Sequence, residues 1–218
     1  MTTHTRIDRI APLSGLVFAG LTIAGDTIIG PFPEGDTPAE QLPGYYATHA
    51  GHVAVGAALW FWATLFFAVF GVVLAARCRR LAVPAPVVWT LLIGTGVETV
   101  FSAIGAAQGS LLAQIGVEPG VSPAALQAWQ MSLSMWGSNA GTVLLLGAVA
   151  VAGFGYRALP RWLAGTGVLL AVASFLPSPF GFFASLVFLL WAAVAGIVLA
   201  ARPGAVVARP APQPVEVA

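Results

Sequence analysis

Long apolar runs, separated by short polar segments, dominate the chain from residue 10 to residue 201. A helix rises 1.5 Å per residue, so about 20 mostly apolar residues suffice to cross the hydrocarbon core of a bilayer. The pattern therefore predicts six membrane-spanning helices, over residues 10–30, 52–76, 86–115, 132–156, 160–176 and 179–201. The predicted fold class is all-α, a polytopic transmembrane helical bundle.

Prolines support the starts of several of these helices. Proline lacks a backbone N–H and is tolerated in the first helical turn, where that donor has no helical partner. Prolines stand at positions 84, 86, 123, 160 and 179. Residues 1–202 are thus expected to form one six-helix transmembrane domain. The Pro-, Ala- and Val-rich residues 203–218 are expected to be a disordered cytoplasmic tail.

The basic residues test the count of six independently. All nine are arginines, and with six spans they fall on one side of the membrane, at positions 6, 9, 77, 79, 80, 157, 161, 202 and 209. The opposite loops carry Glu34, Asp36, Glu40 and Glu118. The positive-inside rule makes the arginine side cytoplasmic, so both termini are predicted to be cytoplasmic. An arginine-only composition rich in Ala, Gly, Val and Pro is typical of high-GC bacterial genes, which indicates the bacterial cytoplasmic (inner) membrane.

Composition narrows the function classes. Hydrophobic residues make up 58% of the chain and charged residues 8%, against about 25% charged in a typical soluble domain. The lipid bilayer is therefore the expected surrounding, and a net charge of +1 without a basic helix face gives no sign of a nucleic-acid partner. The absence of lysine excludes a Schiff base, and the single cysteine, Cys78, excludes an intramolecular disulfide.

The largest outer loop covers residues 31–51. Thr37-Pro38-Ala39-Glu40 has the form of a helix capping box with proline at the first helical position. It predicts a short interfacial helix through Tyr45 and Tyr46, with Pro43 as a possible kink. The second large outer segment, residues 122–131, is expected to extend the helix over 132–156 above the membrane.

Two ionisable residues, Asp26 and Glu98, fall within the expected spans, where such groups are rare and usually face the bundle interior. Helical spacing gives Glu98 a face of small and polar residues and predicts a second such stripe along the helix over 132–156. The first comprises Thr95, Glu98, Ser102, Gly105 and Gly109, and the second Gln127, Gln130, Ser134, Ser138 and Gly141.

Two facing stripes would form a polar seam that opens toward the outside. A carboxyl group there is expected to be protonated or paired, because desolvation penalises its charged form. The candidate ligand-binding residues are Glu98, Ser102, Gln130, Ser134 and Asp26. Two interpretations of Glu98 remain open: a proton carrier or anchor for a cationic or hydroxylated ligand, or a protonated hydrogen-bond donor that fastens two helices. Asp26 is either part of that site, or a group that is solvated at the outer interface or hydrogen-bonded to a neighbouring helix.

His49 and His52 are spaced three apart at the outer start of the second span, so two imidazoles can share one helix face. A zinc or copper site needs at least a third ligand, for which Asp26, Asp36 and Glu40 are the candidates. The alternative is a pair of solvated histidines. No G-x-S-x-G, H-E-x-x-H or P-loop motif occurs, so no catalytic residue is assigned and no cofactor is identified.

Short motifs on the loops resemble a known group of proteins. Asp36-x-Pro38-Ala39-Glu40 is followed by Tyr45-Tyr46 and Gly51, and Leu159-Pro160-Arg161-Trp162-Leu163 enters the fifth span. These motifs resemble uncharacterised six-helix integral membrane proteins of actinobacterial type, which form a domain of unknown function. The resemblance runs from the first span to the sixth and implies the architecture without an activity.

The sequence favours a non-enzymatic protein that binds or transports a small amphipathic ligand or a proton near Glu98. The first alternative is an accessory or assembly subunit of a membrane complex, in which the polar seam is purely structural. The second is a metal-dependent membrane hydrolase that uses His49 and His52. A homo-oligomer or a larger membrane partner would suit so small a bundle.

Overall fold

The structure is a computed structural model that describes residues 7, 9–31, 33, 37–132, 136–175 and 180–201. Every regular element in these ranges is helical, which confirms the all-α class. The helices are α2 (Ser14–Ile29), α3 (Leu42–Arg80), α4 (Ala85–Ile115), α5 (Pro123–Ser132), α6 (Trp136–Tyr156), α7 (Arg161–Ala173) and α8 (Phe180–Ala201), with short 3-10 helices η1 (Ala11–Leu13) and η2 (Ala39–Gln41). The expected tail over 203–218 lies outside the described residues.

Among the residues whose side chains are described, four helical stretches are long and apolar enough to cross a membrane. They are Ala11–Ile29, Ala39–Arg80, Ala85–Ile115 and Phe183–Ala201. The segments Ala140–Tyr156 and Arg161–Ala173 are also apolar but shorter. Each of the six expected spans thus overlaps a helix.

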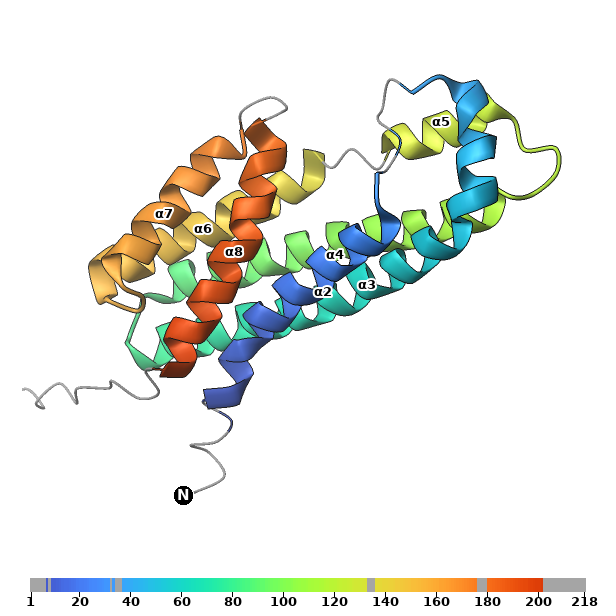
Figure 1. Cartoon of the computed structure of the whole chain (residues 1–218). Helices are drawn as coiled ribbons and strands as arrows, with labels where there is room; N and C mark the ends of the chain where they lie inside the picture. The colour runs from blue at the N-terminus through green and yellow to red at the C-terminus, as the bar shows by residue number, and fades with distance from the viewer. Residues whose placement is uncertain are drawn as a thin grey trace, which may run out of the picture.

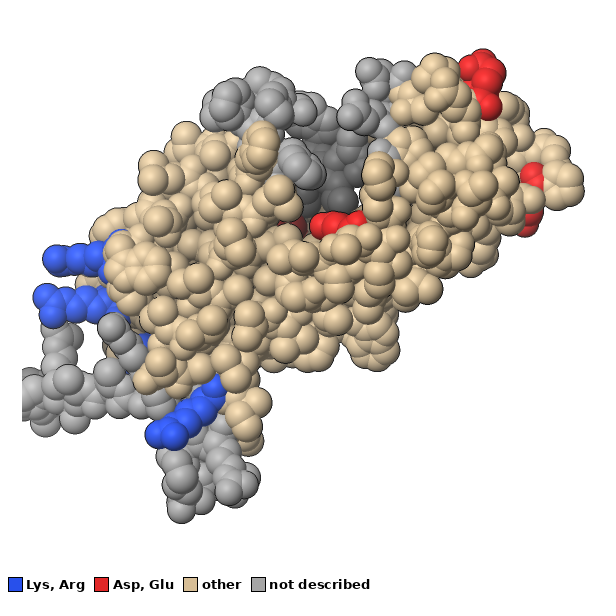
Figure 2. Space-filling model, in the orientation of Figure 1, with Lys and Arg blue, Asp and Glu red and all other residues tan. Residues whose placement is uncertain are grey.

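Six of the helices form a closed ring. Helix α2 contacts α3, α3 contacts α4, α4 contacts α6, α6 contacts α7, α7 contacts α8, and α8 contacts α2 again. Figure 1 shows that α2 begins and α8 ends at the same end of this ring. We call it the arginine end, because the described basic side chains gather there (Figure 2).

The ring is apolar on its outside as well as in its interior, unlike a soluble bundle. One apolar cluster, drawn from all six helices, fills the interior toward the arginine end. Large apolar side chains also cover the outside, among them Val72, Trp89, Leu169 and Leu190, each 58–70% exposed. A soluble protein rarely exposes apolar side chains on this scale, so the outer faces suit a lipid environment.

Helices α4 and α6 approach each other closely through glycines. A Cβ added to Gly94 would lie 2.5 Å from the backbone nitrogen of Leu145, and one added to Gly141 would lie 2.5 Å from that of Glu98. Small residues allow such backbone contact between membrane helices. The middle of α4, which carries Glu98, is thereby fixed against α6.

Helices α3 and α4 extend well beyond the ring at the end opposite the arginines. With 39 residues, α3 is about 58 Å long at 1.5 Å per residue, nearly twice the hydrocarbon thickness. A second apolar cluster, which includes Leu42, Tyr46, Leu112 and Leu126, joins these extensions to α5. We call this region the outer cap (Figure 1).

The outer cap corrects three expectations. The expected interfacial helix is the first part of α3, and Pro43 lies in the first turn of that helix. The capping box is wrong, because Pro38 is the N-cap residue of η2 and no side chain caps that helix. The segment expected to extend the helix over 132–156 above the membrane forms α5, which packs back against η2 and α3.

Candidate functional site

A cavity of about 300 Å³ lies within the ring and is lined by residues of α2, α3, α4, α6 and α8 and by Ser174, the C-cap residue of α7. We call it the central cavity. It places Asp26 of α2 and Glu98 of α4 around the same space, although 71 residues separate them in the sequence. Figure 2 shows acidic side chains within a hollow about midway along the molecule.

Glu98 is half-buried and hydrogen-bonded on both carboxylate oxygens. The Thr142 hydroxyl on α6 donates to Oε2 at 2.8 Å, and the Ser102 hydroxyl on α4 lies 3.5 Å from Oε1. A carboxylate can accept more bonds than these two, so it retains acceptor capacity for a ligand. The group is fixed in orientation while its remaining lone pairs are still available to the cavity.

Asp26 lies on the more exposed side of the cavity. The indole nitrogen of Trp60 on α3 donates to its Oδ1 at 2.9 Å. Gly25 makes this contact possible, because a Cβ there would lie 2.8 Å from the Trp60 ring. The second carboxyl group is therefore held by an aromatic side chain from the adjacent helix.

Aromatic rings close the cavity toward the arginine end. The ring centroids of Phe18 and Phe67 are 5.0 Å apart, and those of Phe67 and Phe188 are 5.9 Å apart. All three rings are buried, and Phe18 and Phe188 line the cavity itself. The cavity thus has carboxyl and hydroxyl groups above an apolar aromatic floor.

The structure brings together three of the five candidate ligand-binding residues. Asp26, Glu98 and Ser102 all line the central cavity. Gln130 does not: it lies in α5, where its side-chain amide donates to the backbone carbonyl of Pro33. Ser134 lies outside the described residues.

Several cavity residues were not among the candidates. Thr142 lies four residues after Ser138, so the predicted stripe, if continued by one turn, would have included it. Thr22 and Thr64 gave a weaker indication in the sequence, because a threonine in an apolar helix can satisfy its hydroxyl locally. Here each hydroxyl donates to the carbonyl four residues earlier in its own helix. The sequence did not indicate Trp60, because a tryptophan in an apolar helix is as readily explained by packing as by a role in a site.

The two histidines lie apart from this cavity. Nδ1 of His49 is 3.0 Å from the Tyr45 carbonyl and 2.7 Å from the Thr48 hydroxyl, and its ring stacks on Tyr45. The ring centroids of His49 and His52 are 6.3 Å apart. Among the described residues no group of three or more metal-ligating side chains forms, although Asp36 is not among them.

The lining of the central cavity determines what it can hold. Its described lining has two carboxyl groups, several hydroxyls and no basic side chain, and apolar atoms make up most of the wall. Carboxylates form their strongest hydrogen bonds with cationic donors, and aromatic faces attract cations. Its volume is at the lower limit of small-molecule sites, which is about 300 Å³. The arrangement suits a small molecule with one positive group and an apolar body.

Comparison with known proteins gives no relative to reason from. No family model, no curated protein and no solved structure matches this chain.

Proposed function

We propose that this protein is a multi-pass inner-membrane protein that binds a small amphipathic ligand in the central cavity. A positively charged group on the ligand contacts Glu98 and Asp26, and its apolar part rests on the aromatic floor. The bound ligand is either transported or sensed through this same site. The protein acts without catalysis.

One observation carries the proposal: two acidic side chains from different helices share one cavity inside the ring. Ionisable groups inside a membrane are expensive, and they usually mark a ligand or ion pathway. If Glu98 only fastened helices, Thr142 and Ser102 would suffice as partners, and neither Asp26 nor a cavity would be needed.

The proposal includes six spans with both termini in the cytoplasm. The described arginines support it, because they gather at one end of the ring while acidic side chains mark the outer cap (Figure 2). Under the positive-inside rule the arginine end faces the cytoplasm. Cysteine-accessibility labelling of single-cysteine variants at positions 40 and 161 in a Cys78→Ser background would test this, because only position 40 should react from outside.

The binding test uses 2-phenylethylamine, which is cationic at neutral pH, and 2-phenylethanol, its neutral counterpart of nearly equal size. Purified protein in mild detergent should gain thermal stability with the amine and much less with the alcohol. Glu98→Gln should weaken amine binding at least tenfold, a loss of about 1.4 kcal/mol, while leaving the fold intact. Glu118→Gln, which removes an acid in the outer cap, is the matched control and should bind as the parent protein does.

The structural alternative has its own observation, the 2.8 Å bond from Thr142 on α6 to Glu98 on α4. If the seam only joins these helices, Glu98→Gln and Thr142→Val should each lower stability by about 1 kcal/mol. The amine would then stabilise none of the proteins. That result would support an accessory subunit and overturn ligand binding.

A further inference from the structure

A second cavity, of about 280 Å³, lies at the arginine end of the ring. We call it the arginine pocket. It is bounded by the end of α3, the turn between α6 and α7, and the end of α8. Among the residues that the structure describes, three arginines line it, Arg77, Arg157 and Arg161, and no carboxyl group does. Three positive side chains thus converge on one concave site.

Arg77 fixes the geometry of this pocket. It is half-buried, and its Nε donates to the backbone carbonyl of Ala158 at 2.9 Å. This bond connects the last turn of α3 to the turn that carries Arg157 and Arg161. The guanidinium is planar and carries five N–H donors, a geometry that matches a phosphate group.

Arg157 occupies a backbone conformation that favours glycine. Its φ is +55°, in the left-handed region, and the next residue closes the end of α6 with a bond from the Ala158 N–H to the Ala152 carbonyl at 3.1 Å. Glycine is the common residue at such helix ends, because a Cβ is sterically disfavoured in the left-handed conformation. The chain therefore places a long cation where its own backbone would be more stable without one.

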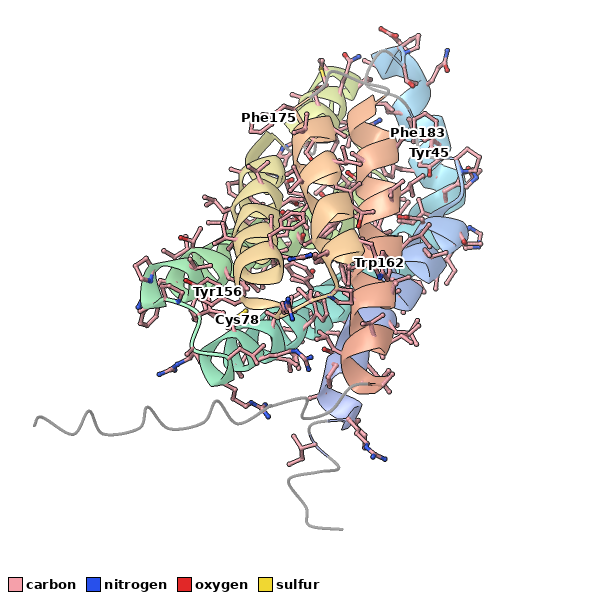
Figure 3. All side chains as sticks on the ribbon, turned by 90° about the vertical axis from the view of Figure 1, so that its left-hand side faces the viewer. Tyr45, Cys78, Tyr156, Trp162, Phe175 and Phe183 are labelled. Atoms are coloured by element: carbon pink, nitrogen blue, oxygen red, sulfur yellow. The ribbon has the colours of Figure 1, made fainter. Side chains whose placement is uncertain are left out.

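We propose that the arginine pocket binds a phosphate group, and that its source is the headgroup of an anionic phospholipid in the leaflet at the arginine end. Arginine matches phosphate with paired hydrogen bonds, and basic pockets between membrane helices suit such headgroups. Val198 and Leu199 of α8 complete the wall with apolar surface on which an acyl chain can lie. The exposed ring of Trp162 lies near this end of the bundle, as expected for a residue at the headgroup level (Figure 3).

The experiment measures binding of phosphatidylglycerol and of phosphatidylcholine to the full chain in a neutral detergent, by native mass spectrometry and by thermal shift. Phosphatidylglycerol should bind stoichiometrically and raise the melting temperature, and phosphatidylcholine should do so much less. Inorganic phosphate and glycerol 3-phosphate form the second arm. If they stabilise the protein as much as phosphatidylglycerol does, the site takes a soluble phosphate; if they have no effect, the lipid is the source.

Two variants distinguish a loss of lipid binding in the pocket from a loss of folding stability. Arg157→Gly relieves the left-handed backbone, so this protein should melt at the same or a higher temperature without lipid, yet bind phosphatidylglycerol about tenfold more weakly. Arg161→Gln should show a comparable loss. Arg79→Gln removes an exposed charge at the same end but outside the pocket, and it should bind as the parent does.

Equal losses in Arg79→Gln and Arg161→Gln would show a diffuse charge effect and overturn the site. Equal binding of the two lipids by the parent protein would overturn it as well. Neither result depends on the central cavity, which shares no residue with the arginine pocket.

Discussion

The central cavity and the arginine pocket are nearly equal in volume, about 300 and 280 Å³, but opposite in charge and in position. The first contains Glu98 and Asp26 within the ring. The second contains three arginines at one end. In the described linings, acidic side chains occur in the first cavity and basic side chains in the second, so the two cavities are suited to different ligands.

The difference shows how the bilayer restricts charge. An arginine near a helix end can extend its long side chain toward water and retain its charge at little cost. Glu98, in the middle of α4, has a short side chain and depends on Thr142, Ser102 and the cavity itself for polar contacts. A charge at the end of the bundle needs little explanation, whereas an acid in its centre calls for a ligand or a structural partner.

The largest expected effect comes from Gly141→Ala. The new methyl group would lie 2.5 Å from the Glu98 backbone nitrogen and 2.9 Å from its Cα, so α6 must move away from α4. We expect a loss of about 1–3 kcal/mol in the free energy of unfolding, together with weaker 2-phenylethylamine binding. Phosphatidylglycerol binding should persist. Thermal unfolding and both binding assays on one preparation check this.

Gly147→Ala is the matched control for that change. Gly147 lies on α6 as well, but nothing lies within 4 Å of the position that its Cβ would take. Alanine is the better helix former by about 1 kcal/mol, so this variant should be as stable as the parent or more so. Equal destabilisation by the two changes would mean that the close α4–α6 contact is not real.

The next largest effect is that a variant in one cavity loses the ligand of that cavity alone. Glu98→Gln should weaken amine binding at least tenfold and leave phosphatidylglycerol binding unchanged, and Arg161→Gln should do the reverse. Titrations of both variants with both ligands test it. If either change weakened both ligands equally, the two cavities would be coupled and the comparison would fail.

Salt should distinguish the cavities by a smaller, several-fold effect. The Debye length falls from about 10 Å at 0.1 M to 3 Å at 1 M, and exposed charges are screened far more than buried ones. Raising sodium chloride over this range should weaken phosphatidylglycerol binding clearly and amine binding less. Similar salt dependence for both ligands would show that the amine binds at an exposed acidic surface.

The smallest effect concerns Tyr46 in the outer cap, away from both cavities. Its hydroxyl is buried and has no hydrogen-bond partner among the described residues. An unpaired buried hydroxyl is costly, so Tyr46→Phe should be neutral or stabilise the protein by up to about 1 kcal/mol. Neither ligand should bind differently. A marked loss of stability on thermal unfolding would show that the hydroxyl has a partner.

The sequence predicted the helices better than the contacts between them. Apolar runs locate helices well, because each must satisfy its own backbone hydrogen bonds wherever lipid surrounds it. Pro84, Pro123 and Pro160 do stand at the starts of helices. The outer cap was harder to predict. Helix α3 begins at Leu42, before the expected start of its span at residue 52. The composition of residues 42–51 does not distinguish an interfacial helix from an extension of the span.

The candidate site was likewise predicted only in part. Glu98 and Asp26 could be singled out because a carboxyl group in an apolar run is conspicuous in one dimension. Gln130 fitted the same helical spacing, but α5 packs against η2 and α3 whereas α6 packs against α4 and α7, so Gln130 lies away from the central cavity. Helical spacing groups residues on one face but does not show what that face packs against.

The amino-acid sequence alone determined that this chain is helical, that it is too apolar for water, and that its arginines follow one side of the predicted spans. These properties depend on local composition and on the energy of placing backbone and charge in lipid. Only the tertiary structure decided that Asp26 and Glu98 share a cavity and that three arginines converge on another. Such pairs depend on which helices are neighbours in the ring, and close contacts such as Gly141 against Glu98 set that order.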